Sequence, residues 1–226
     1  MRDRTRAREL AAEFHRKGDP TGWFEVLYRE AEEGKSTIPW DDRHPTPHLV
    51  GFWMQHPLQA EGKSALVTGC GLGDDAEQLA KWGFRTTAFD ISETAIRACR
   101  KRFPNSAVNY QAANLLEPPR DWRGHFDFVF EANTLQVLPE PLRPQATKNI
   151  AEFLRPGGHL LLIARHREPS DPVGEMPWPL TRAEISAFTA HGLEEVLFDI
   201  LPDVEEPNVR RFRVLFQMRR STAQNG

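Results

Sequence analysis

The chain has 226 residues, of which 39% are hydrophobic and 27% charged, and its formal net charge is -3 at pH 7. This length suits one α/β domain, and this share of apolar residues can form a sizeable core. Nucleic-acid binders usually carry a basic excess, which this chain lacks. No apolar run approaches the roughly 20 residues that a membrane-spanning helix requires. We therefore expect a small-molecule partner, with no nucleic acid and no membrane association.

The two cysteines, Cys70 and Cys99, are too few for a disulfide framework or a metal-ligand cluster. Residues 1–9 are highly charged and lack the apolar centre of a signal peptide. A reducing compartment is the simplest environment for such a chain. We expect a cytoplasmic protein that holds no metal and is a monomer or a homodimer.

The first 60 residues predict a helical segment that differs from the rest of the chain. Glycines at positions 18 and 34 end two predicted helices, and prolines make the segment after them irregular. In chain order these are helices at 4–17 and 23–33, an irregular stretch at 38–47 and a short helix at 48–54. We expect residues 1–60 to be a helical lid, 61–220 to form the main domain with it, and 221–226 to be a disordered tail.

From Ser64 onward, short apolar strands alternate with helices, which predicts a doubly wound, mostly parallel α/β sheet. A capping box at Thr181 opens a last helix, which ends at Gly192. Two further strands then follow with no helix between them, so they should be antiparallel and reverse one strand of a seven-stranded sheet. The predicted strands are 65–68, 85–89, 107–111, 126–131, 159–164, 193–200 and 211–218, and the predicted helices are 75–82, 92–103, 141–154 and 181–191.

A glycine loop, Gly69-Cys-Gly-Leu-Gly73, lies where the first strand turns into a helix. Glycines there let the backbone approach a ligand closely. Asp74 and Asp75 follow, although a dinucleotide pyrophosphate requires bare amides at a helix N-terminus. A cofactor with an ammonium and a sulfonium group tolerates these charges. Asp90 ends the second strand, where a carboxylate can accept hydrogen bonds from both ribose hydroxyls.

The loop and the acids also have plainer explanations that the sequence leaves open. The loop could be an ordinary tight turn between a strand and a helix. Asp90 could cap a helix, and Asp74 and Asp75 could simply interact favourably with the helix dipole. We predict cofactor contacts for this constellation as a whole because its members occur together. The predicted contacts here are Gly69, Cys70, Gly71, Gly73, Asp74, Asp90 and Ile91.

Three segments carry a family resemblance. Residues 38–47, which read Ile-Pro-Trp-Asp-Asp-Arg-His-Pro-Thr-Pro, residues 65–75 and residues 89–96 together resemble the thiopurine S-methyltransferase superfamily, and within it the halide and thiol methyltransferases. The resemblance covers roughly residues 20 to 190, and its Pro-Trp-Asp element is the more specific part. It implies a class I, Rossmann-like methyltransferase fold, with S-adenosylmethionine as cofactor and a small-molecule methyl acceptor.

The resemblance also implies roles for residues outside the glycine loop. Trp40 would pack near the methionine end of the cofactor, and Trp23 would help to form the lid, although a buried tryptophan is often simply a core residue. Asn114 and Leu115 follow the third strand, where this class binds the adenine amino group and ring. Glu131 ends the fourth strand and could meet the methionine ammonium, or be an ordinary surface acid.

The methyl acceptor is harder to infer, because residues 131–138 depart from the family pattern. A thiol or halide needs no strong base, whereas an oxygen or nitrogen acceptor can require one. His44, Arg165 and His166 are the candidates for catalytic residues, and Arg165 could instead recognise an anionic acceptor. We expect a thiol or another soft nucleophile. An O- or N-methyltransferase and a non-catalytic S-adenosylmethionine-binding protein stay open as alternatives, while a dehydrogenase fits least.

Overall fold

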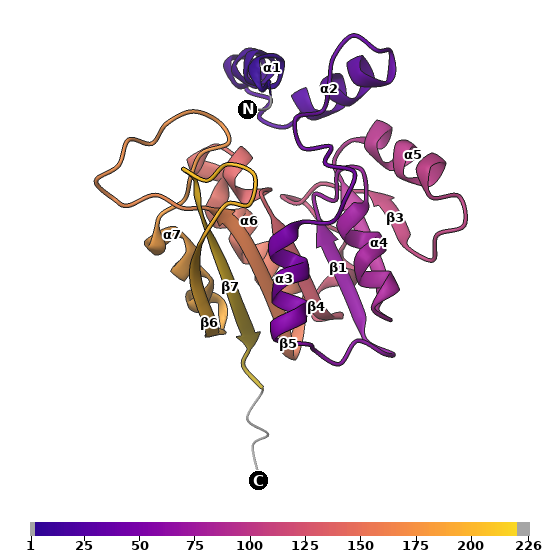
Figure 1. Ribbon diagram of the computed structural model, residues 1–226, viewed down its shortest axis with the longest axis vertical. Helices are drawn as coiled ribbons and strands as arrows, with labels where there is room; N and C mark the ends of the chain where they lie inside the picture. Colours follow the sequence, from indigo (N-terminus) through magenta and orange to yellow (C-terminus); the bar gives the residue numbers. More distant parts are fainter. Residues whose placement is uncertain (1–2, 221–226) are drawn as a thin grey trace.

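The computed structural model of the protein describes residues 3–220 and contains one central sheet with helices on both faces (Figure 1). The helices are α1 (Thr5–Arg16), α2 (Trp23–Glu32), α3 (Pro47–Gln55), α4 (Asp74–Lys81), α5 (Glu93–Arg102), α6 (Arg143–Phe153) and α7 (Arg182–Ser186). The strands are β1 (Ser64–Thr68), β2 (Arg85–Asp90), β3 (Asn109–Ala112), β4 (Phe126–Ala132), β5 (Leu154–Arg165), β6 (Leu193–Pro202) and β7 (Arg210–Met218). Single 3-10 turns are η1 (Arg120–Trp122), η2 (Leu135–Val137), η3 (Glu140–Leu142) and η4 (Ala187–His191). The predicted tail at 221–226 lies outside the described residues.

The sheet has seven strands in the order β3-β2-β1-β4-β5-β7-β6. Strands β1 to β5 pair in parallel, whereas β7 pairs antiparallel with both β5 and β6. The predicted doubly wound sheet with one reversed strand is therefore confirmed. The strand order turns back between β1 and β4, and open α/β sheets bind ligands at the carboxyl ends of the strands beside such a point.

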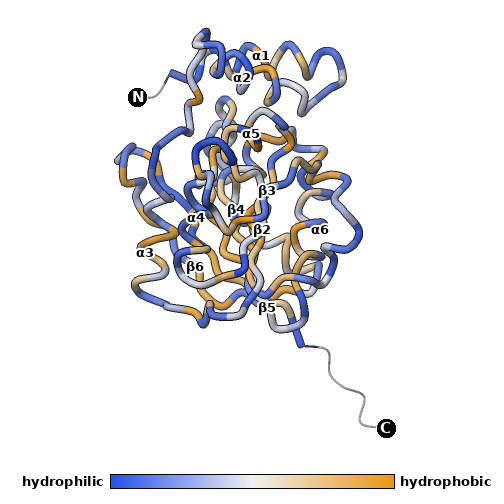
Figure 2. Tube along the Cα trace, turned by 90° about the vertical axis from the view of Figure 1, so that its right-hand side faces the viewer, coloured by the Kyte–Doolittle hydropathy of each residue, from blue (hydrophilic) through white to orange (hydrophobic). Residues whose placement is uncertain are grey.

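The two faces of the sheet are covered by different helices. Along β5, Leu160 and Leu162 pack with α6 and α7, while Leu161 and Ile163 face the side of α3, α4 and α5. This alternation follows from the period of two in a strand, and burial on both faces explains the continuous apolar sequence. Figure 2 shows the hydrophobic segments gathered in the centre, with α3 and α4 on one side and α6 on the other.

Helices α1 and α2 form a separate layer above the carboxyl ends of the central strands (Figure 1). Trp23 and Leu27 of α2 pack against Leu10 of α1 and against Met176 from the loop after β5. No helix within residues 3–220 is long and apolar enough to cross a membrane. The predicted lid of residues 1–60 needs one correction: Leu49 and Phe52 bury α3 against the sheet, so α3 belongs to the main core.

Several predicted element boundaries differ from the structure. The fifth strand begins at Leu154 and not at residue 159, because Leu154 already pairs with Phe126 of β4. The third strand begins at Asn109 and not at residue 107, because its ladder with β2 starts at the pair Thr87–Asn109. The helix predicted for 181–191 divides into α7 and the 3-10 turn η4, and the Thr189 hydroxyl there donates to the Ser186 carbonyl. The predicted capping box is present, since Thr181 accepts from the Glu184 amide and Glu184 accepts from the Thr181 amide.

We expect Phe216→Ala to lower the free energy of unfolding by about 3–5 kcal/mol, because it leaves a cavity in the core. Phe216 is fully buried in β7, and its ring centroid lies 5.5 Å from that of Phe188. Val196→Ala is the matched control on the neighbouring strand, since Val196 is 55% exposed, and it should change stability by less than about 0.5 kcal/mol. Urea unfolding measures both values, and equal effects would contradict the assigned core.

Candidate functional site

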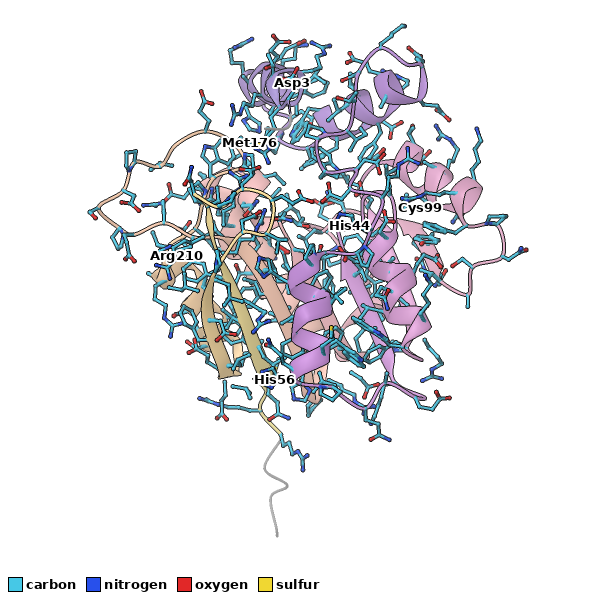
Figure 3. The ribbon with its side chains drawn as sticks, viewed as in Figure 1. Asp3, His44, His56, Cys99, Met176 and Arg210 are labelled. Atoms are coloured by element: carbon cyan, nitrogen blue, oxygen red, sulfur yellow. The ribbon has the colours of Figure 1, made fainter. Side chains whose placement is uncertain are left out.

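A cavity of about 240 Å³ lies between the carboxyl ends of the central strands and the layer formed by α1 and α2. Its wall combines the glycine loop, the segment before α3, the loops after β2, β3 and β4, and the loop between β6 and β7. Figure 3 shows His44 and Met176, which both line it, between the sheet and the two upper helices. One cavity therefore receives residues from segments far apart in the chain.

The glycine loop forms the floor of the cavity, and its conformation explains why glycine is needed there. Gly69 and Gly71 have φ values of 56° and 55°, a region that other residues rarely adopt. A Cβ on Gly69 would lie 2.4 Å from the Thr134 hydroxyl oxygen, and one on Gly71 would lie 3.3 Å from the Tyr28 hydroxyl oxygen. Gly69 therefore also lacks room for a side chain, and at Gly71 the Tyr28 hydroxyl would have to move slightly.

Asp90 holds the glycine loop in place. Its Oδ2 accepts a hydrogen bond of 3.0 Å from the Gly71 amide, and its Oδ1 accepts one of 2.9 Å from the Ser92 amide. Asp90 lines the cavity although it is only 6% exposed, and burial raises its pKa to about 6. Each carboxylate oxygen keeps a second lone pair for a ligand, so Asp90 lies where a ribose could be bound.

The two acids after the loop act differently from the sequence-based expectation. Asp74 lines the cavity, but its carboxylate accepts bonds of 2.6 and 2.7 Å from the Arg102 guanidinium, which neutralises its charge. Asp75 accepts bonds of 2.6 and 2.9 Å from the amide and the hydroxyl of Thr46. Asp75 therefore fastens the segment before α3 to the start of α4. We expected both carboxylates to face a cationic cofactor as free charges. This is corrected for Asp74, whose charge is paired with Arg102 although the residue lines the cavity.

Aromatic side chains from the N-terminal segment cover the glycine loop. Trp40 and Tyr28 line the cavity, and the Trp40 indole N–H donates to the Tyr28 hydroxyl at 2.7 Å. Burial and the nearby Asp90 raise the pKa of Tyr28, so the hydroxyl stays protonated. Trp23 does not line the cavity; its fully buried ring packs against Phe24 and Trp40. The prediction of a cofactor contact at Trp23 is therefore corrected to a core position behind the cavity wall.

Residues after β2 and β3 form one side of the cavity. Ile91, Asn114 and Leu115 all line it, together with Cys70 from the glycine loop. The Asn114 side-chain oxygen accepts a hydrogen bond of 2.9 Å from the Leu116 amide, which fixes the orientation of the side chain. The structure thus brings the predicted nucleoside contacts to one place.

Glu131 is fully buried at the end of β4 and does not line the cavity. Its Oε1 accepts a hydrogen bond of 2.7 Å from the Leu135 amide, while Oε2 has no partner within the described residues. The prediction that Glu131 meets a ligand ammonium is corrected, because its carboxyl group lies behind the wall. It instead holds the turn η2, whose residues Gln136 and Val137 line the cavity.

The candidate catalytic residues separate in the structure. Arg165 and His44 line the cavity, whereas His166 does not. The His166 ring packs edge-on against Phe212 at 4.8 Å, because adjacent residues of a strand point to opposite faces. His166 is therefore corrected to a packing residue. Among residues 3–220, no group of three or more potential ligands is placed to hold a metal ion.

Four functional candidates were missed by the sequence reasoning: Arg4, Tyr28, His48 and Arg211, which all line the cavity. His48 is 8% exposed and its Nε2 has no hydrogen-bond partner in the described residues. Burial and the charge of Arg211 lower the pKa of His48, so its ring is neutral. In the sequence, Tyr28 and Trp23 fall on one apolar helix face, which indicates packing and gives no sign of a binding role. No sequence signal singled out Arg4, His48 or Arg211.

The fold is Rossmann-like, and its cavity lies at the carboxyl ends of the parallel strands, where such sheets bind their ligands. Residues 65–158 match the family model described as a methyltransferase domain. The chain is 28% identical over 194 residues to thiocyanate methyltransferase 1 of Arabidopsis thaliana, covering 85% of this chain and 78% of that protein. It is 30% identical over 117 residues to a ubiquinone biosynthesis O-methyltransferase of Coxiella burnetii, covering 51% of this chain and 49% of that protein.

Among solved structures, N-methyltransferase NodS from Bradyrhizobium japonicum WM9, in complex with S-adenosyl-L-homocysteine, has the same fold. The TM-score is 0.66 at 22% sequence identity, over 86% of this chain and 98% of that chain. Residues 65–158 therefore form a methyltransferase domain, and the fold is that of the class I methyltransferases. The cavity fits S-adenosylmethionine, because the glycine backbone and a buried carboxylate acceptor lie side by side.

We expect Glu131→Gln to stabilise the protein at high pH and to leave it unchanged at low pH. Burial raises the pKa of Glu131 from 4.5 to about 8, so its contribution to stability is present below pH 4.5 and is lost as the pH rises through 8. Glutamine imitates the protonated acid, so the variant should gain roughly 2–4 kcal/mol at about pH 9. Urea unfolding at several pH values measures this, with exposed Glu117→Gln as control. A constant difference across the pH range would contradict it.

Proposed function

We propose that the enzyme transfers the methyl group of S-adenosylmethionine to a small soft nucleophile, and that a thiol is the preferred acceptor. The observation that carries this proposal is the weak basicity of the buried histidine in the cavity wall. His48 lines the cavity, and burial and the charge of Arg211 lower its pKa. A thiolate or halide attacks without a strong base, since the enzyme mainly aligns it and removes its water.

The N-terminal segment supports the same proposal. It carries the Pro-Trp-Asp element, and Trp40 closes the cavity above Gly71. The similarity to thiocyanate methyltransferase 1 extends over 85% of this chain and is thus not confined to the methyltransferase domain at 65–158. An aromatic, water-poor cover favours displacement at a sulfonium carbon, because it strips the nucleophile of solvent.

For the cofactor itself, we propose contacts that follow the order of the strands. S-adenosylmethionine supplies an electrophilic methyl group on a sulfonium when it is bound. Asp90 would accept from the ribose hydroxyls, Asn114 would bind the adenine amino group between Ile91 and Leu115, and the glycine loop with Trp40 would enclose the methionine end. These assignments rest on the positions of the side chains around the cavity.

An O- or N-methyltransferase is the second candidate, and one observation favours it. The ring of His48 is neutral and its Nε2 has no hydrogen-bond partner within the described residues, so this atom could accept a proton from a hydroxyl or an amine. The relative from Coxiella burnetii is named as an O-methyltransferase. A non-catalytic S-adenosylmethionine-binding protein is the third candidate.

Asp90→Ala should weaken the binding of S-adenosylhomocysteine about 100-fold or more, because it removes two charge-assisted hydrogen bonds of about 1.5 kcal/mol or more each. It also frees the Gly71 amide. Isothermal titration calorimetry measures the affinity. Asp127→Ala is the matched control, since Asp127 accepts from the Ser64 amide at 2.9 Å at the opposite end of the sheet. Unchanged affinity in Asp90→Ala would refute the ribose assignment.

A panel of a thiol, thiocyanate, a phenol and an amine tests the acceptor class. The thiol should be methylated at least about 100-fold faster than the phenol or the amine, because it needs no strong base. His48→Gln should change the rates for the thiol and for thiocyanate by less than about threefold. Activity confined to the phenol or the amine and lost in His48→Gln would establish the second candidate instead. Tight cofactor binding with no turnover of any acceptor would favour the third.

A further inference from the structure

The carboxyl end of β5 and the amino end of β7 place two arginines directly opposite each other. Arg165 and Arg211 are partners in the antiparallel ladder, and both line the cavity. Like charges directly opposite each other across two strands are destabilising. Arg4, the residue before α1, adds a third guanidinium group to the cavity wall. The repulsion between these guanidinium groups must be offset by negative charge nearby.

The loop between β6 and β7 supplies three acids, and two of them, Asp203 and Glu206, pair with the three arginines. Glu206 accepts from Arg4 at 2.7 Å with Oε1 and from Arg165 at 2.8 Å with Oε2, so one carboxylate serves two guanidinium groups. Asp203 is bonded to Arg211, and the remaining acid of the loop, Glu205, faces His44. Around Arg4 and Arg165 one positive charge is therefore left without a carboxylate of its own.

Arg165 also has N–H groups that are not used in hydrogen bonds with the described residues. Its Nη2 is bonded to Glu206, whereas its Nε and Nη1 have no partner within residues 3–220. Its side chain is 15% exposed and lines the cavity. Burial and the nearby Arg4 lower the pKa of Arg165, which an anionic ligand would offset. Arg211, by contrast, uses its Nε for Asp203 and its Nη1 for Asn133.

We propose that the methyl acceptor carries a carboxylate group apart from its reacting atom, and that Arg165 binds this carboxylate with Arg4 beside it. The inference rests on the proposed function in that it concerns the acceptor of the same site. Glu206 fixes the Arg165 guanidinium through one nitrogen and leaves a second edge for the ligand. A guanidinium binds a carboxylate through two parallel hydrogen bonds, a geometry that lysine cannot provide.

The position of the arginines agrees with this role. β5 and β7 lie on the other side of β4 from β1 and β2, whose ends carry the glycine loop and Asp90. A carboxylate at Arg165 thus binds at the end of the cavity away from the ribose site. The reacting atom of the acceptor then lies between the two ends, where the walls include Val137, Leu138 and Met176. Apolar walls there suit a soft nucleophile.

The test compares 3-mercaptopropionate with its methyl ester, which differ in the negative charge. The wild-type enzyme should use the acid with a kcat/KM at least about tenfold higher than the ester. Arg165→Gln should lower the kcat/KM of the acid at least about tenfold more than that of the ester, and Arg213→Gln should preserve the preference. Arg213 is a buried arginine of β7, paired with Asp199 at 2.7 Å outside the cavity wall. Glu206→Gln should lower the KM of the acid alone, because it removes the negative charge that competes for both guanidinium groups.

A binding measurement separates this inference from the proposed function. Calorimetry on the complex with S-adenosylhomocysteine compares 3-(methylthio)propionate with its methyl ester, and the acid should bind at least about tenfold more tightly. Selective binding without thiol turnover would refute the thiol acceptor and support the carboxylate site. Thiol turnover with equal use of acid and ester, or a preference that survives Arg165→Gln, would overturn the carboxylate site alone.

Discussion

The hydrogen bond from the Gly71 amide to the Asp90 carboxylate is the contact on which the rest of the site depends. It joins the loop after β1 to the end of β2, so the two segments that would enclose a nucleoside keep a fixed relation. The bond is possible because β1 and β2 are parallel and end at the same edge. Burial makes this carboxylate costly to ionise, and a polar ligand offers hydrogen bonds that offset the cost.

The N-terminal segment completes what the sheet begins. Asp75 fastens Thr46 to the start of α4, and Trp40 reaches Tyr28 above the glycine loop. Trp40 and Thr46 both belong to the irregular, proline-rich stretch at 38–47. Its prolines disfavour a helix, and side-chain contacts with the structures around it hold it in place. The packing of this segment therefore covers a site that the sheet alone would leave open.

The two ends of the cavity carry different ionisable groups. Carboxylates lie at the ends of β1 and β2, and guanidinium groups with their paired acids lie at the ends of β5 and β7. The reversal of β7 produces the second group, because it brings the first residues of β7 beside the last residues of β5. The reversed strand β7 also distinguishes this sheet from an all-parallel one. The same feature of the topology therefore shapes the fold and places the arginines at the end of the cavity where we propose that the methyl acceptor binds.

The sequence by itself determined the succession of strands and helices, the reversed strand, the glycine loop and Asp90, because these follow from local periodicity and from short motifs. The order of the strands within the sheet came from the tertiary structure. Only the tertiary structure decided whether Asp74, Glu131, His166 and Trp23 face the cavity with a free side chain. Each outcome depends on a partner or a side-chain direction that distant segments set. Arg102 neutralises Asp74, and the strand pleat turns His166 away from the cavity. Side-chain direction and ion pairing across the fold leave no periodic signal in a chain, which is why Arg4 and Arg211 became visible only once β7 lay beside β5.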